Sequence, residues 1–109
     1  MAVAARLLLV DNDPFALESL SSALEKAGYE TDAVPDGPAA LRLLADTPYD
    51  LLIADIRMTP MDGLTLLERA RETVPGLPAL FVTDRASLDG AVQAMRAGAL
   101  DYLPKPFHV

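Results

Sequence analysis

The sequence predicts an α/β fold: a doubly wound parallel sheet of five strands in a three-layer α/β/α arrangement. Two observations predict it. Short apolar runs of strand length alternate with amphipathic helical segments about every ten to fifteen residues, and the strongest of these runs stop abruptly at polar residues. Such alternation implies right-handed βαβ crossovers and a sheet with helices on both faces. A length of 109 residues with 51% hydrophobic residues is sufficient for one domain with its own core.

Charge and cysteine content narrow the range of partners. The net charge of -7 and the pI near 4.4 argue against direct binding of this domain to nucleic acid or to an anionic membrane, because both need clustered Lys and Arg. The absence of cysteine excludes disulfides and thiolate metal sites, and it fits a reducing compartment. The apolar start of the chain, residues 1–10, is too short for a signal peptide or a membrane span. We therefore expect a cytoplasmic protein that binds no membrane.

The predicted strands are the apolar or β-branched runs. The first and third are continuous apolar runs typical of buried parallel strands, whereas the second alternates weakly and suits a position nearer the sheet edge. The fourth ends on Thr83 and Asp84, and the fifth precedes a Pro-Lys-Pro segment. In chain order we expect strands at 7–10, 29–34, 50–54, 77–82 and 102–103.

Four helices are predicted from capping residues and apolar spacing. The first is capped by Asp13 and closed by Gly28, with an apolar face of Leu17, Leu20, Leu24 and Ala27. The second lies around 40–45 and stops before Pro48; the third follows Gly63 and ends near Thr73. The fourth is capped by Ser87 and closed by Gly98, and its predicted inward side carries Leu88, Ala91, Val92 and Met95.

Polar residues follow the strands and should meet in space. The carboxyl ends of parallel strands share one edge of the sheet, where open α/β folds place their chemistry. A cluster of carboxylates persists only with a compensating cation or proton, and Mg²⁺ suits oxygen ligands of this kind. The residues expected at this edge are Asp11, Asn12, Asp13, Asp55, Arg57, Thr83, Asp84 and Lys105.

Five segments in register resemble the receiver domain of two-component response regulators. They are residues 8–14, 55–63, 82–83, 96–99 and 105–107. The resemblance runs in order from residue 6 to the end of the chain. It implies a flavodoxin-like fold with strand order 2-1-3-4-5, in which a last helix would follow the fifth strand. We therefore expect the native chain to continue past Val109 into that helix, and often into an output domain.

The resemblance also implies residue roles. Asp55 is the expected phosphoacceptor, and Asp11, Asn12, Asp55 and the backbone carbonyl of Arg57 are the expected Mg²⁺ ligands. Thr83 and Lys105 would bind phosphoryl oxygens, and the bond between Lys105 and Pro106 would be cis. Tyr102 matches an aromatic switch that turns inward when Thr83 moves. Asp13 is favoured as a helix cap over a metal ligand, and Asp62 and Gly63 are expected to be structural.

Three positions depart from the family pattern. Asn12 stands where the family usually has a charged ligand, so we expect weaker Mg²⁺ binding. Asp84 replaces a small residue beside the phosphorylation site, and we expect an altered lifetime of the phosphoryl group. Pro60 comes one place later than usual, which predicts a somewhat different path for its loop.

The leading interpretation is a switch rather than a metabolic enzyme. A sensor histidine kinase would phosphorylate Asp55, and the face formed by the fourth helix and fifth strand would signal to an output domain or a downstream protein. The alternative is an atypical receiver that serves as a phosphorylation-independent interaction module. A phosphohydrolase or nucleotide-binding protein is disfavoured, because no glycine-rich phosphate loop follows any strand. The sequence leaves a homodimer open.

Overall fold

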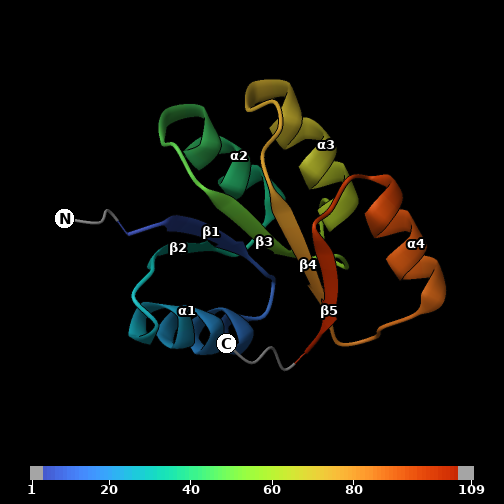
Figure 1. Ribbon diagram of the computed structural model, residues 1–109, viewed down its shortest axis with the longest axis horizontal. Coiled ribbons are helices and arrows are strands. Elements are labelled where there is room, and N and C mark those ends of the chain that lie inside the picture. Colours follow the sequence, from blue (N-terminus) through green and yellow to red (C-terminus); the bar gives the residue numbers. More distant parts are fainter. Residues whose placement is uncertain (1–3, 106–109) are drawn as a thin grey trace.

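The fold is a five-stranded parallel sheet with helices on both faces, as Figure 1 shows in the computed structural model, which describes residues 4–105. The strands run in the order β2-β1-β3-β4-β5, which confirms the predicted flavodoxin-like topology. The strands are β1 (Arg6–Val10), β2 (Glu30–Val34), β3 (Leu51–Asp55), β4 (Ala79–Thr83) and β5 (Asp101–Pro104). The helices are α1 (Pro14–Lys26), α2 (Gly37–Asp46), α3 (Gly63–Thr73) and α4 (Leu88–Arg96).

The strand ends lie slightly later than predicted. β3 and β4 were expected to end at residues 54 and 82, and each extends one residue further, to Asp55 and Thr83. Both polar residues are therefore held by the sheet ladder: Asp55 pairs with Val82, and Thr83 pairs with Pro104. Their backbones are fixed by strand pairing and do not depend on the loops that follow.

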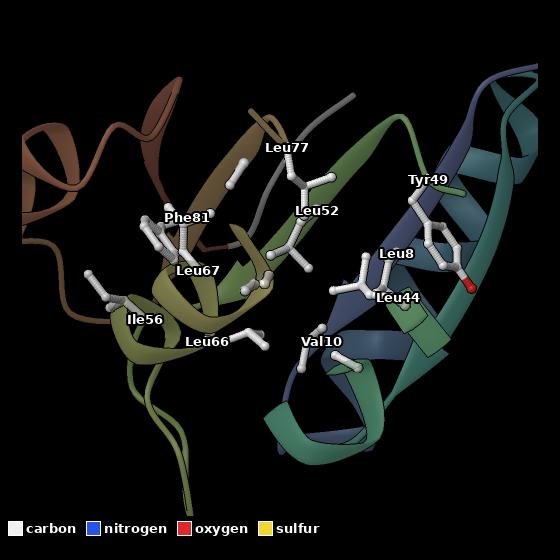
Figure 2. Packing of buried hydrophobic residues seen from close by; sticks show 14 of the residues in the cluster. Leu8, Val10, Leu44, Tyr49, Leu52, Ile56, Leu66, Leu67, Leu77 and Phe81 are labelled. Carbon is white, nitrogen blue, oxygen red and sulfur yellow. The ribbon is translucent and has the colours of Figure 1, made fainter. Parts of the chain in front are cut away.

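The sheet packs against its helices through two hydrophobic cores, one on each face. The larger core lies under α2, α3 and α4, and Figure 2 shows Leu52 and Phe81 of the sheet facing Leu66 and Leu67 of α3. The smaller core lies under α1 and contains Leu7, Leu9, Leu24, Ile53 and Val82. Its neighbours Leu80 and Leu103 are only partly buried. One sheet face thus carries three of the described helices and the other carries α1 (Figure 1).

The predicted helix caps are confirmed. The side chains of Asp13, Asp62 and Ser87 accept the N–H groups of Phe15, Thr65 and Gly90, respectively. Each cap satisfies a backbone donor that has no partner inside the helix. Gly28, after the end of α1, has a φ of 100°, which is a conformation that favours glycine. Gly63 proves to be the first residue of α3, and a Cβ there would lie 2.5 Å from the carbonyl oxygen of Asp55.

The predicted inward face of α4 is wrong. Leu88, Val92 and Met95 are 83%, 39% and 48% exposed, respectively, whereas Ala94 is fully buried. The side turned toward the molecule carries small residues, because α4 approaches its neighbours closely. A Cβ at Gly90 would lie 3.0 Å from Cζ of Tyr102. The large apolar side chains therefore lie on the outer side of this helix.

Residues 4–105 contain no helix whose length and hydropathy would allow it to cross a membrane.

Candidate functional site

The sheet register brings the predicted site residues to one edge. β1 and β3 are neighbours and pair Val10 with Ala54, so that Asp11 and Asp55 follow at the same level. Asp11 is 5% exposed, Asp55 is 7% exposed and Thr83 is fully buried. At the end of β5, the Lys105 N–H donates to the carbonyl of Thr83 at 2.7 Å, which places the lysine beside the two carboxylates.

The same local turn follows β1, β3 and β4. Asp11 Oδ1 accepts the N–H of Asp13 at 3.0 Å, and Asp55 Oδ1 accepts the N–H of Arg57 at 2.9 Å. Thr83 Oγ1 accepts the N–H of Arg85 at 3.1 Å. In these turns a short polar side chain bonds the backbone two residues ahead. Each loop therefore leaves its strand in a defined direction, and one oxygen of each carboxylate stays available.

Lys105 binds both available carboxylate oxygens. Its Nζ lies 2.5 Å from Asp11 Oδ2 and 2.9 Å from Asp55 Oδ2. Burial lowers the pKa of Lys105, but the hydrogen bonds and negative charges of the two carboxylates outweigh it, and the pKa is raised above its usual value. The ammonium group therefore stays charged and compensates the two carboxylates in the absence of a metal.

The donor set fits a magnesium ion. Within residues 4–105 no group of three His, Cys, Asp or Glu side chains is arranged to hold a metal. Two carboxylates that already share one cation, together with a backbone carbonyl and water, form the sparse oxygen set that Mg²⁺ accepts. Asp11, Asp55 and Arg57 would supply it.

Asn12 has backbone partners in this structure. Its Oδ1 accepts the N–H of Thr59 at 2.8 Å, and its Nδ2 donates to the carbonyls of Pro35 and Thr59. The Thr59–Pro60 peptide bond in the same loop is cis. The predicted cis bond at Lys105–Pro106 falls on Pro106, outside the described residues.

The remaining predicted residues lie around this centre. Arg57 and Asp84 are exposed, in the loops after β3 and β4. Tyr102, in β5, is partly buried against the larger core, and its hydroxyl accepts the N–H of Ser87 at 3.2 Å. Tyr102 also borders a hollow of about 460 Å³ between α4 and the loop after β3, whose lining includes Arg57 and Asp62. The predicted switch residue is thus in contact with α4.

Sequence reasoning missed Arg71, Gly90 and the backbone partners of Asn12. The backbone partners of Asn12 were not foreseen, because they lie in distant loops. Arg71 was also missed: its guanidinium donates to the carbonyls of Leu77, Ala97 and Gly98 and so joins α3 to the end of α4. Gly90 carried a usable signal, because a glycine inside a helix often marks a close approach of another group.

These features define a class of protein. It is an α/β domain of flavodoxin-like topology, in which a lysine bridges two buried carboxylates at the carboxyl edge of the sheet. The model of the response regulator receiver domain family matches residues 7–109. The response regulator protein FleR of Pseudomonas aeruginosa is 46% identical over 105 residues, which are 96% of this chain and 22% of that protein. This chain belongs to the response regulator receiver domain family, whose members are signalling domains.

Solved structures agree with this assignment. A receiver domain protein from Methanospirillum hungatei superposes with a TM-score of 0.88 at 34% identity, covering 97% of this chain and 85% of that one. A response regulator from Burkholderia pseudomallei, with a phosphorylated aspartic acid, a calcium ion and citrate, gives a TM-score of 0.88 at 28% identity over 96% of this chain and 62% of that one. The chain spans about a fifth of the length of FleR.

Proposed function

We propose that this domain accepts a phosphoryl group on Asp55 from a phosphohistidine of a sensor histidine kinase. The observation that carries the proposal is the Lys105 bridge, which holds two buried carboxylates of neighbouring strands against one ammonium group. Such an arrangement stabilises negative charge at a point where open α/β sheets place their reactive groups. The Burkholderia relative with a phosphorylated aspartic acid supports the same chemistry.

The transfer has a simple balance of bonds. Asp55 Oδ2, the carboxylate oxygen that faces Lys105, forms the new bond to phosphorus. The bond from phosphorus to the histidine nitrogen breaks, and the leaving imidazole keeps the electron pair and takes up a proton from solvent. Lys105 and Thr83 bind the phosphoryl oxygens. When bound by Asp11, Asp55 and the Arg57 carbonyl, with Asn12 beside them, Mg²⁺ supplies charge neutralisation to the transferring group.

Phosphorylation would then change the surface of α4 and β5. The Thr83 hydroxyl accepts the Arg85 N–H and can donate its own proton to a phosphoryl oxygen, so a shift of Thr83 toward that oxygen would pull on the backbone of Arg85. The loop between β4 and α4 would follow, and with it the contact between Ser87 and Tyr102. The domain thus works as a two-state switch that modifies only its own aspartate. An output domain or a separate protein would recognise the changed face.

The test is phosphorylation by a small donor. Purified protein is incubated with acetyl phosphate and MgCl₂, and intact mass is measured by mass spectrometry. We expect a gain of one phosphoryl group in the wild type and none in Asp55→Ala. Asp50→Asn is the matched control, because Asp50 lies at the opposite end of β3 and its carboxylate accepts the N–H of Arg6. Equal gains in the wild type and Asp55→Ala would refute the assignment.

A second function is favoured by Asn12. Its amide oxygen already accepts the Thr59 N–H, which reduces its capacity to bind a metal, and a receiver with weak metal binding could serve as an interaction module without phosphorylation. This alternative predicts no mass gain at saturating Mg²⁺. It also predicts that Asp55→Ala leaves the binding of an output partner unchanged.

A further inference from the structure

The carboxamide of Asn12 connects the loops after three neighbouring strands. Asn12 itself follows β1, Pro35 follows β2, and Thr59 lies in the loop after β3. Nδ2 donates to the Pro35 carbonyl at 2.7 Å and to the Thr59 carbonyl at 3.0 Å, while Oδ1 accepts the Thr59 N–H at 2.8 Å. We call these three hydrogen bonds the Asn12 clamp.

The clamp requires an amide side chain. Two of its three partners are carbonyl oxygens, which need a donor, and the third is an N–H group, which needs an acceptor. The same partners fix the orientation of the amide, because the opposite orientation would set its oxygen against two carbonyl oxygens. An aspartate at position 12 would create that repulsion permanently, and an alanine would remove all three contacts.

The clamp acts on the loop that carries a proposed metal ligand. The first turn of this loop is held by the bond from the Arg57 N–H to Asp55, and its end by the bond from the Gly63 N–H to the carbonyl of Ile56 at 3.0 Å. Thr59 lies between these two points and is held by Asn12 through both of its backbone groups. The Arg57 carbonyl is therefore fixed from both sides.

We propose that Asn12 is a positioning residue: the clamp orders the loops after β2 and β3 and so presents the Arg57 carbonyl before a metal ion or a phosphoryl donor arrives. The proposal rests on the proposed function for its significance, but the clamp itself exists without either ligand. Asn12 adds no negative charge beside Asp11 and Asp55, but it preorganises the loop after β3 that carries the Arg57 carbonyl.

The experiment uses NMR spectra of the metal-free protein. Asn12→Ala removes the clamp, and Asn12→Asp keeps an acceptor for the Thr59 N–H while it loses both donor bonds. Ser87→Ala is the control, because it removes the cap of α4 and lowers stability at a different site. The measured quantities are the exchange rate of the Thr59 amide proton with water and the backbone amide shifts of residues 36, 57–59 and 61.

In Asn12→Ala the Thr59 amide proton should exchange about tenfold faster, as expected for the loss of one net hydrogen bond, while Ser87→Ala leaves it unchanged. In Asn12→Asp the loop signals should also move, although this variant is the better metal ligand. Unchanged loop signals in Asn12→Asp, or acceleration in Asn12→Ala no greater than in Ser87→Ala, would overturn the proposal. The two proposals can fail separately. If the loop signals move in the Asn12 variants but Asp55 of the wild type accepts no phosphoryl group, the proposed function is refuted and the role of the clamp is supported.

Discussion

Asp84 brings a negative charge next to the proposed phosphorylation site. It is exposed and follows the fully buried Thr83, so its carboxylate is hydrated while it lies close to the approach of an anionic donor. We predict that Asp84→Asn, which keeps the shape and removes the charge, is phosphorylated by acetyl phosphate about two- to threefold faster, as expected for one weakly screened charge. The lifetime of the phosphoryl group should change as well. Both rates can be followed by intact mass over time.

Ionic strength provides the control for this prediction. The difference between wild type and Asp84→Asn should shrink as NaCl is raised, because salt screens an exposed charge. Identical loading and decay in the two proteins at low salt would contradict a role for Asp84.

Tyr49 makes the stability of the fold depend on pH. Burial, followed by the hydrogen bond to Asp32 and its charge, raises the pKa of Tyr49 to about 12. An unfolded tyrosine has a pKa of about 10. Between these values the unfolded chain has lost a proton that the folded protein retains. The stabilisation from Tyr49 is therefore complete below a pH of about 10 and decreases as the pH rises toward 12.

Tyr49→Phe tests this dependence. The substitution removes the hydrogen bond from the Tyr49 hydroxyl to Asp32, 2.6 Å long, and should cost about 1 kcal/mol near neutral pH. The difference from wild type should narrow between a pH of about 10 and about 12, as measured by urea unfolding. Tyr29→Phe, at a position 41% exposed, is the control and should show no such narrowing. A difference that stays constant with pH would argue against a raised pKa.

At the level of single residues, the sequence located the strand-end side chains but not their partners. Asp11, Asp55, Thr83 and Lys105 could be placed because parallel strands deliver their last residues to one edge. The partners of Asn12 could not, because Pro35 and Thr59 lie 23 and 47 residues away in irregular loops. Sequence periodicity carries no information about such backbone contacts.

Among the elements, α4 is attached differently at its two ends. Arg71 donates to the carbonyls of Ala97 and Gly98 at 2.8 Å and 3.0 Å, which places a cation at the negative end of the helix. The other end is tied to the sheet by the bond from the Ser87 N–H to the Tyr102 hydroxyl. Arg71 thus holds the C-terminal end of α4 by two hydrogen bonds, whereas one hydrogen bond to Tyr102 holds its N-terminal end. The inward face of α4 was mispredicted because apolar spacing does not reveal that a close contact requires small side chains.

Gly90 is predicted to be required for the packing of Tyr102 against α4. A Cβ at position 90 would clash with the Tyr102 hydroxyl. Gly90→Ala should therefore break the hydrogen bond between the Tyr102 hydroxyl and the Ser87 N–H and lower stability by about 1 kcal/mol or more, although alanine is the better helix former. In a Tyr102→Leu background the same substitution should instead stabilise the protein by about 0.5–1 kcal/mol. Urea unfolding of the four proteins gives the coupling energy directly. Additive effects of the two substitutions would show that these residues do not interact.

For the whole molecule, alternation of strands and helices was sufficient to predict the topology class, because βαβ units have few ways to pack. The coverage of the sheet was less predictable. The face under α1 retains a groove of about 290 Å³ lined by Ala16, Leu20 and Val82, with Asp11 and Lys105 at one end. The larger core on the other face is closed by α2, α3 and α4.

Magnesium should stabilise the entire domain by binding at Asp11 and Asp55. The chain carries a net charge of -7, and a ligand that binds only the folded state adds about 2.7 kcal/mol at a concentration of about 100 times Kd. We predict a rise in Tm with MgCl₂ that is absent in Asp11→Asn and retained in Asp50→Asn, with NaCl at matched ionic strength as the control for screening.

Because the Asn12 amide adds no charge, saturation should require more Mg²⁺ in the wild type than in Asn12→Asp. Asn12→Asp should nevertheless be the less stable of the two without metal, since it loses the clamp. An equal rise with NaCl, or in Asp11→Asn, would show that screening of the net charge, and not binding at Asp11 and Asp55, stabilises the fold.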